Sequence, residues 1–407
     1  MALSGGLDSS VLLHLLAQLA PSLRFQLSAV HVHHGLSPNA DAWAMHCERF
    51  AQSLNIPISI HRVSVERQSA DGLEAAARRA RHAVFAATDC DWIVLAHHRG
   101  DQAETLLHRL MRGTGVQGMA GMRECDPARR IVRPLLDVPR SGLETHASAH
   151  RLEWIEDESN RDTHFTRNFL RREVLPLWSE KQQGLEANLA RAAVLFAEAA
   201  DLLEALAHED ALRIAPGTAG ARQRLADLDE ARARNLLRHL LALAGERAPD
   251  ASWLQEALRQ LLTAKDGARP VLGSTALCAW REGFWLEHEV ALPQAIAWRG
   301  ELHLPWAGGE LCFTPGVGEG ALRISANALV WIKPRVGGEQ IRPDASRPSR
   351  SIKQLAQEAD VPPWQRDVLP CLWCDDRLIW IGGLGADTSA RCRPDEEGWR
   401  IEWRVSA

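Results

Sequence analysis

The chain has 407 residues, of which 46% are hydrophobic and 24% charged, and its formal net charge is -5 at pH 7. A domain usually has roughly 100–200 residues, so this length predicts about two to four domains. No apolar run approaches the roughly 18 residues of a membrane helix, and the N-terminus lacks the pattern of a signal peptide. We therefore expect a cytoplasmic protein, in which a nucleic-acid partner would need only a local basic patch.

The first 140 residues alternate between strands and helices. Strands are expected at 25–33, 58–65, 92–96 and 131–133, and helices at 9–19, 41–54, 73–88, 102–112 and 141–150. Apolar strands that alternate with helices favour a parallel sheet covered by helices on both sides. Right-handed crossovers then give a doubly wound α/β layer.

The pattern changes near Pro176. Residues 183–245 are rich in Ala, Leu, Arg and Glu at helical spacing, and short strands with Gly and Pro turns begin near Val271. A last segment, from about residue 330, mixes strands with one helix at 351–359. These changes predict an α/β domain at 1–177, a helical or mixed domain at 178–330, and a small α+β domain at 331–407.

The cysteines give little sign of a metal site. Eight are scattered through the chain, and Cys371 and Cys374 form the one close pair. A zinc ribbon needs a second pair at a suitable distance, and none follows. We therefore expect buried structural thiols.

A glycine loop, LSGGLDSS at residues 3–10, opens the chain. Glycine lets backbone N–H groups approach an anion closely, and the helix that follows directs its partial positive charge at the same point. Asp8 would repel phosphates unless a cation lay between them, which suggests Mg²⁺. The loop has neither the lysine of a Walker A motif nor the GxGxxG pattern. The alternative is an ordinary Ser/Gly turn in which Asp8 caps the helix.

The loop resembles that of the PP-loop ATP pyrophosphatases, and further stretches narrow the resemblance. They are HVHHGLSPNADAW (31–43), GLEAAARRARHAVF (72–85), LAHHRGDQAETLLHRLMRGTG (95–115), WIEDESNRDTHFTRNFLRREVLP (154–176) and the run from GGEQ to WIGG (337–383). In this order and spacing they resemble the tRNA(Ile)-lysidine synthase family. The resemblance implies a two-step ligase reaction. ATP adenylates the wobble cytidine of isoleucine tRNA with a CAU anticodon, and free lysine then displaces AMP to form lysidine.

The resemblance also implies roles for individual residues. Asp101 and Glu104 lie three apart at a helix start, on one face and just past the end of a strand, where ligands of open α/β sheets bind. They could hold Mg²⁺ or orient the lysine ammonium and take its proton, or they could simply cap the helix. The expected site is ATP binding by Ser4, Gly5, Gly6, Leu7, Asp8 and Ser9; catalysis by Asp8, Asp101, Glu104, Arg78 and His97; substrate binding by Arg112, Arg167, Asn168 and Arg171; and Mg²⁺ binding by Asp8 and Asp101.

A basic window is the expected tRNA contact. Residues 331–355 carry six basic side chains against two acidic ones, and basic side chains bind phosphates without reading sequence. The six are Lys333, Arg335, Arg342, Arg347, Arg350 and Lys353. Trp331 and Trp364 could stack on bases, but we expect them to be packed in the interior.

Two departures from the family pattern leave alternatives open. Gly100 stands where the family usually has an acidic or amide residue, and only Met1, Ala2 and Leu3 precede the loop, where the family has about six or more residues forming a central strand. We expect that three residues cannot supply this strand, and hypothesise a misassigned start. The alternative functions are another PP-loop tRNA-modifying adenylator, such as a thiolase, and a catalytically decayed tRNA-binding protein.

Overall fold

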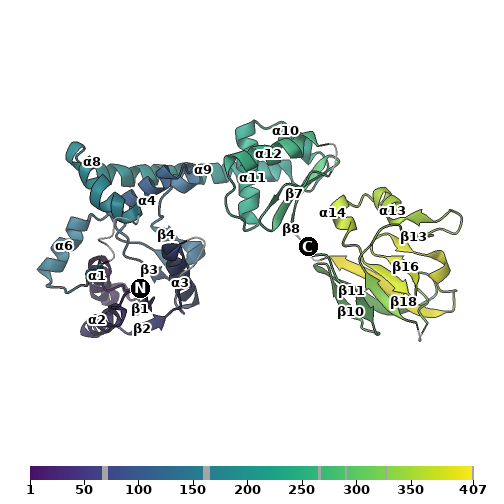
Figure 1. The fold of residues 1–407 in the computed structure, drawn as a ribbon, viewed down its shortest axis with the longest axis horizontal. Helices are drawn as coiled ribbons and strands as arrows, with labels where there is room; N and C mark the ends of the chain where they lie inside the picture. The colour runs from purple at the N-terminus through teal and green to yellow at the C-terminus, as the bar shows by residue number, and fades with distance from the viewer. Residues whose placement is uncertain (67–71, 159–165, 265–266, 289–290, 326–327, 406–407) are drawn as a thin grey trace. The chain divides into compact units, whose positions relative to one another are not determined.

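The computed structural model describes residues 1–66, 72–158, 166–264, 267–288, 291–325 and 328–405 (Figure 1). The chain divides into two compact units, Met1–Leu203 and Glu204–Ala407. Within the described ranges, no helix combines the length and apolar character that a membrane crossing requires.

Short strands form the sheet of the first unit. The strand β1 (Ala29–His33) pairs in parallel with β2 (Ile58–Arg62), and β3 (Ile93–Val94) pairs in parallel with β5 (Ile131–Val132). These are the parallel strands that the sequence predicts, each somewhat shorter than expected. One further strand, β4 (Cys125–Asp126), pairs antiparallel with β5 and was not predicted.

The first three residues join the two halves of this sheet. The Val30 N–H donates to the Met1 carbonyl at 2.8 Å, and the Leu3 N–H donates to the Val30 carbonyl at 2.9 Å. On the other side, the Ala2 N–H donates to the Val94 carbonyl at 3.0 Å. The expectation that three residues cannot supply the strand is wrong, because a parallel pairing needs only these alternating backbone groups. Met1 and Leu3 are also buried in the core.

Helices cover both faces of the sheet. One core cluster packs α1 and α2 against Ala29, and another packs Phe85 of α3 against Val30. Ala29 and Val30 are successive strand residues, so their side chains point to opposite faces. The helices of this unit are α1 (Leu7–Leu23), α2 (Ala40–Ser53), α3 (Leu73–Ala87), α4 (Arg99–Met111), α5 (Val116–Met119), α6 (Arg140–Ala149), α7 (Thr166–Phe169) and α8 (Leu175–Lys181), with a 3-10 turn at Pro127–Arg129 and a π-helical turn at Leu170–Val174.

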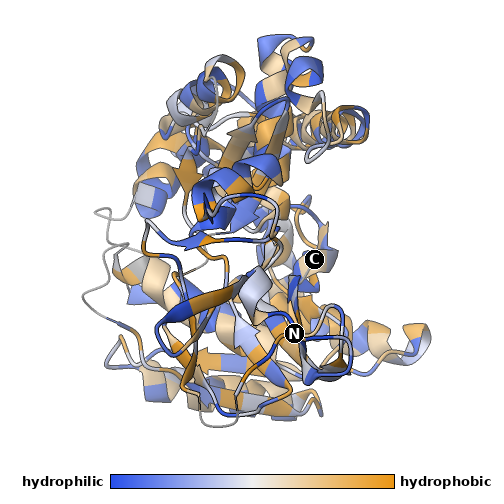
Figure 2. Ribbon diagram, turned by 90° about the vertical axis from the view of Figure 1, so that its right-hand side faces the viewer, coloured by the Kyte–Doolittle hydropathy of each residue, from blue (hydrophilic) through white to orange (hydrophobic). Residues whose placement is uncertain are grey.

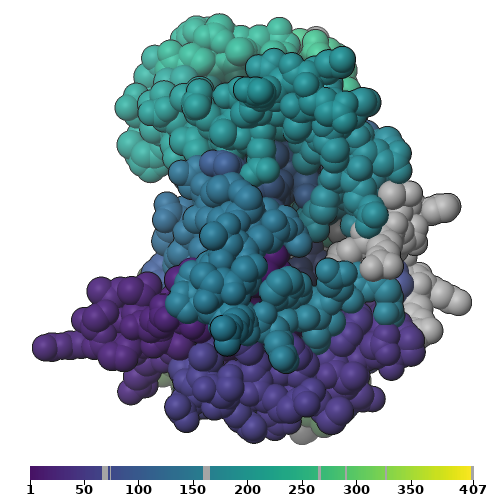
Figure 3. All heavy atoms as spheres, turned by 90° about the vertical axis from the view of Figure 1, so that its left-hand side faces the viewer, coloured from purple at the N-terminus to yellow at the C-terminus, as the bar shows by residue number. Residues whose placement is uncertain are grey.

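Segments distant in sequence meet on one side of the first unit. The space-filling view shows purple N-terminal residues beside teal residues from the later helices of the same unit (Figure 3). The α1 helix packs on α6, and Val11, Leu12 and Leu13 of α1 share one core cluster with Leu143 and Ala147 of α6. This packing brings the glycine loop close to residues that follow β5.

The chain from residue 185 to residue 263 is mainly helical, as the sequence predicts for residues 183–245. The long α9 (Leu185–Ile214) continues from the first unit into the second. There it is followed by α10 (Ala221–Ala226), α11 (Glu230–Leu243) and α12 (Ala251–Thr263). The helices in the hydropathy view carry both blue and orange residues (Figure 2), as expected of helices with one polar and one apolar face. The antiparallel strands β6 (Val271–Leu272), β7 (Thr275–Trp280) and β8 (Gly283–His288) share that core.

The C-terminal part is rich in β structure. One sheet has the order β17-β16-β15-β12-β9, and a second has the order β10-β11-β18. Their strands are β9 (Ile296–Trp298), β10 (His303–Trp306), β11 (Gly309–Val317), β12 (Val330–Lys333), β15 (Cys371–Cys374), β16 (Arg377–Ile381), β17 (Gly385–Ala386) and β18 (Glu397–Val405). The hairpin β13 (Gln340–Ile341) and β14 (Arg350–Ser351), the helices α13 (Ile352–Glu358) and α14 (Pro363–Arg366), and a 3-10 turn (Thr388–Ala390) complete this part. These sheets therefore use residues on both sides of position 330.

Candidate active site

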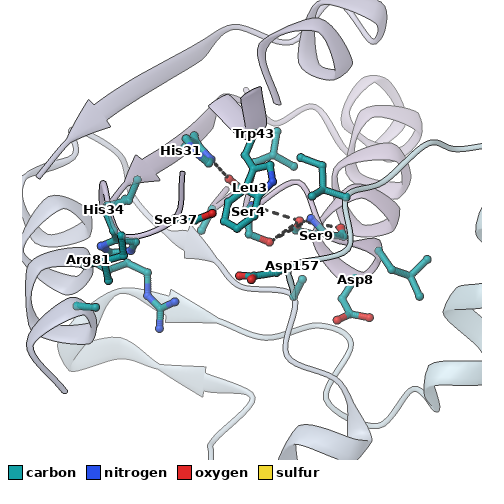
Figure 4. Close-up of a pocket in the computed structure, with 18 of the residues that line it drawn as sticks. Leu3, Ser4, Asp8, Ser9, His31, His34, Ser37, Trp43, Arg81 and Asp157 are labelled. Carbon is teal, nitrogen blue, oxygen red and sulfur yellow. Dashed lines mark hydrogen bonds between the residues drawn. The ribbon is translucent and has the colours of Figure 1, made fainter. Parts of the chain in front are cut away.

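The glycine loop joins the first three residues to α1. Gly5 has φ +86°, and a Cβ there would lie 3.0 Å from Cys47 Sγ and from Ile155 Cδ1, so only glycine fits without strain. The Ser9 hydroxyl donates to the Gly6 carbonyl at 3.0 Å, and the Ser4 N–H donates to Ser9 Oγ at 3.2 Å. Figure 4 shows Ser4 and Ser9 side by side at the start of α1. These bonds hold the loop in one shape.

Asp8 does not cap the helix. The N-cap residue is Gly6, which is extended and has no side-chain cap, and Asp8 lies in the first turn. The alternative of a simple capping turn therefore fails for Asp8. Its Oδ2 lies 3.9 Å from His98 Nε2 and 3.9 Å from Arg140 Nη1. Its Oδ1 is buried without a hydrogen-bond partner among the described residues, which fits a ligand of a cation. Burial raises the pKa of the Asp8 carboxyl, against the lowering effect of His98 and Arg140.

His98 connects the glycine loop to the start of α4. The ring Nδ1 of His98 accepts from the Gly100 backbone N–H at 3.0 Å, and the backbone N–H of His98 donates to Asp101 Oδ2 at 2.9 Å. The two bonds form a capping box. Because Nδ1 accepts, we assign the ring proton to Nε2. That atom lies 3.6 Å from Asp101 Oδ2 and 3.9 Å from Asp8 Oδ2. A buried imidazole thus sits between two carboxylates that are 93 positions apart in the sequence.

The two α4 carboxylates share one arginine. Arg171 Nη2 donates to Asp101 Oδ1 at 2.9 Å and to Glu104 Oε2 at 3.0 Å, while its Nε donates to Glu104 Oε1. Glu104 is only 4% exposed. Burial raises the pKa of its carboxyl, and Arg171 opposes that shift. The π-helical turn that carries Arg171 thereby places a cation over both acids.

One pocket of about 1120 Å³ collects most of the expected site. Lining residues come from the glycine loop, α3, the start of α4, Arg140 and the segment around α7. The expected residues that line it are Ser4, Gly6, Leu7, Asp8, Ser9, His97, Asp101, Glu104, Arg167, Asn168 and Arg171. Gly5, Arg78 and Arg112 are not among its lining residues; Arg112 follows the last turn of α4, and Arg78 is exposed on α3.

Sequence reasoning missed several residues of this pocket. Arg81, rather than Arg78, lines it from α3, and Figure 4 shows Arg81 beside His34 and Asp157 close to Ser4. Arg140 and His98 were also missed. No established pattern pointed to His98, because a capping box usually begins with Ser or Thr rather than with histidine. No sequence pattern pointed to Arg140, which reaches Asp8 only through the packing of α6 on α1.

Burial changes the titration of His97. It lowers the pKa of His97 to about 4, with further lowering by Arg133, Arg81 and Arg78 and opposition from Asp101. An unfolded histidine titrates near 6.5, so below that pH the unfolded chain binds protons more readily than the folded chain. The stabilising contribution of neutral His97 is thus present above pH 6.5 and is lost as the pH falls toward 4.

We therefore expect a histidine-specific pH effect on stability. Between pH 7 and pH 5, the free energy of unfolding of the wild type should fall by about 2 kcal/mol more than that of His97→Gln. Chemical denaturation at both pH values measures this difference. His61→Gln, at an exposed histidine of β2, is the control for the exchange of a histidine for glutamine. Equal pH dependence of the wild type and His97→Gln would contradict the assignment.

A side chain at position 100 of this chain would press on the His98 ring. A Cβ at this position would lie 2.8 Å from His98 Cε1 and 3.1 Å from His98 Nδ1. Gly100→Ala should therefore displace the His98 ring from Asp8 and Asp101, and lower the rate of the ATP-dependent reaction that the family resemblance implies on the order of 10- to 100-fold. Gly142→Ala, in the first turn of α6, is the matched control, since its added methyl group has ordinary contacts from 3.6 Å. Unchanged activity in Gly100→Ala would show that the His98 position is not critical.

The six basic residues of the expected tRNA contact are partly engaged with the protein itself. Arg335 pairs with Asp367 at 3.4 Å and Arg347 pairs with Asp344 at 3.6 Å, while Arg350 contacts Glu358. Arg342 donates to the carbonyls of Ala345 and Arg347, and Lys353 is exposed on α13.

Lys333 has an aromatic environment. Its Nζ lies 5.8 Å from the ring centroid of Trp331 and 5.6 Å from that of Trp373. These distances are within the range of cation–π contacts. The expectation of an interior Trp331 is wrong, because this side chain is 36% exposed; Trp364 is half-buried.

Three ranges of this sequence match models of known protein families. Residues 1–178 match the family described as a PP-loop domain. Residues 1–178 of the first unit therefore form a PP-loop ATP-binding domain. Residues 221–282 match the TilS substrate binding domain, and residues 330–403 match the TilS substrate C-terminal domain.

Several proteins of named function are similar to this chain over nearly its whole length. The chain is 44% identical to the tRNA(Ile)-lysidine synthase of Azoarcus sp., over 99% of this chain and 90% of that protein. It is 44% identical to that of Aromatoleum aromaticum, over 99% and 96%, and 40% identical to that of Nitrosomonas europaea, over 100% and 92%. The chain belongs to the tRNA(Ile)-lysidine synthase family of ATP-dependent ligases.

Proposed function

We propose that this protein ligates lysine to the wobble cytidine of isoleucine tRNA with a CAU anticodon. ATP first adenylates the 2-carbonyl oxygen of the cytidine and pyrophosphate leaves. The side-chain amine of free lysine then attacks the 2-position, loses a proton, and displaces AMP. The product, lysidine, pairs with A instead of G, so the tRNA reads isoleucine codons. The observation that carries this proposal is a glycine loop facing paired carboxylates in one pocket, in a chain of this family.

The ATP site is the glycine loop. The backbone of Ser4, Gly5, Gly6 and Leu7, with the Ser9 hydroxyl, binds the phosphates of ATP at the N-terminus of α1. Asp8 and Asp101 hold Mg²⁺, and the partnerless Asp8 Oδ1 supports this assignment. Bound Mg²⁺ would neutralise phosphate charge during adenylation. Arg81 and Arg140 supply further positive charge at the pocket, and Arg78 adds to it from the exposed side of α3. Neutral His97 is available as an acceptor.

The lysine site is formed by α4 and the turn after α7. Asp101 and Glu104 orient the lysine ammonium, and Glu104 takes its proton. Arg171 neutralises both acids before the substrate binds, and its contacts must weaken for lysine to approach. Arg167 and Asn168, in the same pocket, and Arg112 hold the anticodon nucleotides or the nucleotide phosphates.

The remaining residues serve tRNA binding. We assign catalysis to a doubly wound α/β domain at 1–177, tRNA binding to the helical and mixed domain at 178–330, and further tRNA contacts to a small α+β domain at 331–407. In the last domain Lys333, Arg335, Arg342, Arg347, Arg350 and Lys353 contact phosphates. The protein acts in the cytoplasm, where the tRNA, ATP and lysine are available.

Adenylation without lysine tests the first half of the proposal. With ATP and Mg²⁺ present and lysine omitted, isoleucine tRNA should stimulate pyrophosphate release, and methionine tRNA with the same anticodon should not. A catalytically decayed tRNA-binding protein would bind the tRNA and release no pyrophosphate. That result would contradict the proposal.

A further inference from the structure

Three side chains of types that can bind a metal ion lie together on the hairpin of β10 and β11, about 130 or more positions after the last residue that lines the pocket. His303 is the register partner of Cys312, and Glu310 precedes Cys312 by two residues. Residues two apart on a strand point to the same face, so all three side chains share one face of the sheet. In the part of the chain that the structure describes, this is the one group of three potential ligands that converges closely enough to hold a metal ion.

The distances within the group match a particular coordination geometry. His303 Nδ1 lies 3.2 Å from Glu310 Oε2, and Cys312 Sγ lies 3.7 Å from His303 Nδ1 and 3.6 Å from Glu310 Oε2. With usual zinc bond lengths, a tetrahedral site places nitrogen about 3.3 Å from oxygen and sulfur about 3.6 Å from either. The three atoms therefore already form one face of such a tetrahedron.

The types of ligand atom in this group favour one kind of metal ion over others. A thiolate and an imidazole beside one carboxylate suit Zn²⁺, whereas Mg²⁺ and Ca²⁺ prefer oxygen ligands throughout. The Cys312 thiol would release its proton to solvent on binding, and the thiolate and the Glu310 carboxylate together balance the charge of the ion. Cys312 is buried at 4% exposure, while His303 and Glu310 are exposed, so the group has one fixed and two accessible ligands.

The surrounding charges do not block an ion. Arg404 is the register partner of Glu310 on β18, but its guanidinium is bonded to Glu402 at 2.7 and 2.9 Å. Glu402 is in turn the register partner of Cys312. The carboxylate of Glu402 therefore neutralises the nearby cation and remains engaged with it, which leaves the fourth position to water.

We propose that His303, Glu310 and Cys312 form a zinc site that ties β10 to β11, with water as the fourth ligand. The site is separate from the ligase chemistry and does not depend on the proposed function. Since an ion that binds only the folded chain adds to its stability, the site would stabilise the sheet to which the last strand of the chain belongs.

Cobalt substitution in the full-length protein tests this proposal. Metal-free protein titrated with Co²⁺ should develop a thiolate-to-cobalt absorption band that saturates near one equivalent, and Zn²⁺ should displace it. Cys312→Ser should lose the band, and so should His303→Gln, which alters an exposed side chain and preserves the fold. Cys374→Ser is the control, since it removes a thiol of the one close cysteine pair, and should keep the band. Zn²⁺ should also raise the unfolding temperature of the wild type but not of His303→Gln.

Two results would overturn the proposal. The first is the absence of a thiolate-to-cobalt band in the wild type. The second is a band that persists in both Cys312→Ser and His303→Gln, because another thiol would then be the ligand. Circular dichroism of each variant confirms that any loss of the band does not come from unfolding.

Discussion

Glu104→Gln is expected to lower lysine transfer to tRNA on the order of 100- to 1,000-fold, the usual scale for loss of a general base. Glutamine keeps the size of the side chain but cannot take a proton from the lysine amine. The Glu104 carboxyl is 4% exposed and burial raises its pKa, which makes it a better proton acceptor than a solvated carboxylate. Lysine transfer under single-turnover conditions, measured beside pyrophosphate release, gives both steps.

The separation of the two steps is the decisive part of this experiment. Pyrophosphate release should fall far less than lysine transfer, because adenylation of the cytidine requires no proton from lysine. Glu186→Gln is the control. Glu186 of α9 pairs with Arg99 of α4, the helix that carries Glu104, at 3.2 Å, and it does not line the pocket. An equal loss of both steps in Glu104→Gln would instead give this residue a role in shaping the ATP site.

Asp8→Asn is expected to lower tRNA-dependent pyrophosphate release on the order of 100- to 1,000-fold, as removal of a preorganised charge at a reacting centre often does. The amide cannot balance a cation beside the phosphates, and it leaves the adjacent His98 and Arg140 without their carboxylate. The Mg²⁺ concentration required for half-maximal activity should also rise. Steady-state pyrophosphate release across a Mg²⁺ titration measures both effects.

The matched control for Asp8 is an acid outside the site. Asp41→Asn removes an exposed carboxylate that pairs with Arg62 at 2.7 Å and with His33 at 3.2 Å. This variant should keep its activity and its Mg²⁺ requirement. Full activity of Asp8→Asn with an unchanged Mg²⁺ requirement would remove Asp8 from the assigned metal site.

The local elements of the first unit could be predicted from sequence because their signals are local. Each expected helix and strand of residues 9–150 has a counterpart in the structure, since apolar periodicity and strand–helix alternation are read over a few residues. The short β4 was missed because two residues carry no periodicity. The pairing of Met1–Leu3 was missed because three residues seemed too few for a strand. They pair nevertheless, since Val30 on one side and Val94 on the other offer backbone partners.

The contacts between elements could be predicted only in part. The spacing of Asp101 and Glu104 places them on one helix face, but nothing in that spacing indicates that Arg171 would bridge them from the turn after α7. His97 and His98 are equivalent by type, and only the backbone geometry at the start of α4 turns His98 toward Asp8. Likewise, the choice of Arg81 over Arg78 at the pocket depends on how α3 is rotated against the sheet.

Transfer of labelled lysine tests the central claim most directly. Full-length protein is incubated with ATP, Mg²⁺, labelled lysine and either isoleucine tRNA with a CAU anticodon or methionine tRNA. We expect stable, ATP-dependent incorporation into the isoleucine tRNA alone. Binding of that tRNA without any transfer of lysine, or equal transfer to methionine tRNA, would contradict the function proposed for this protein.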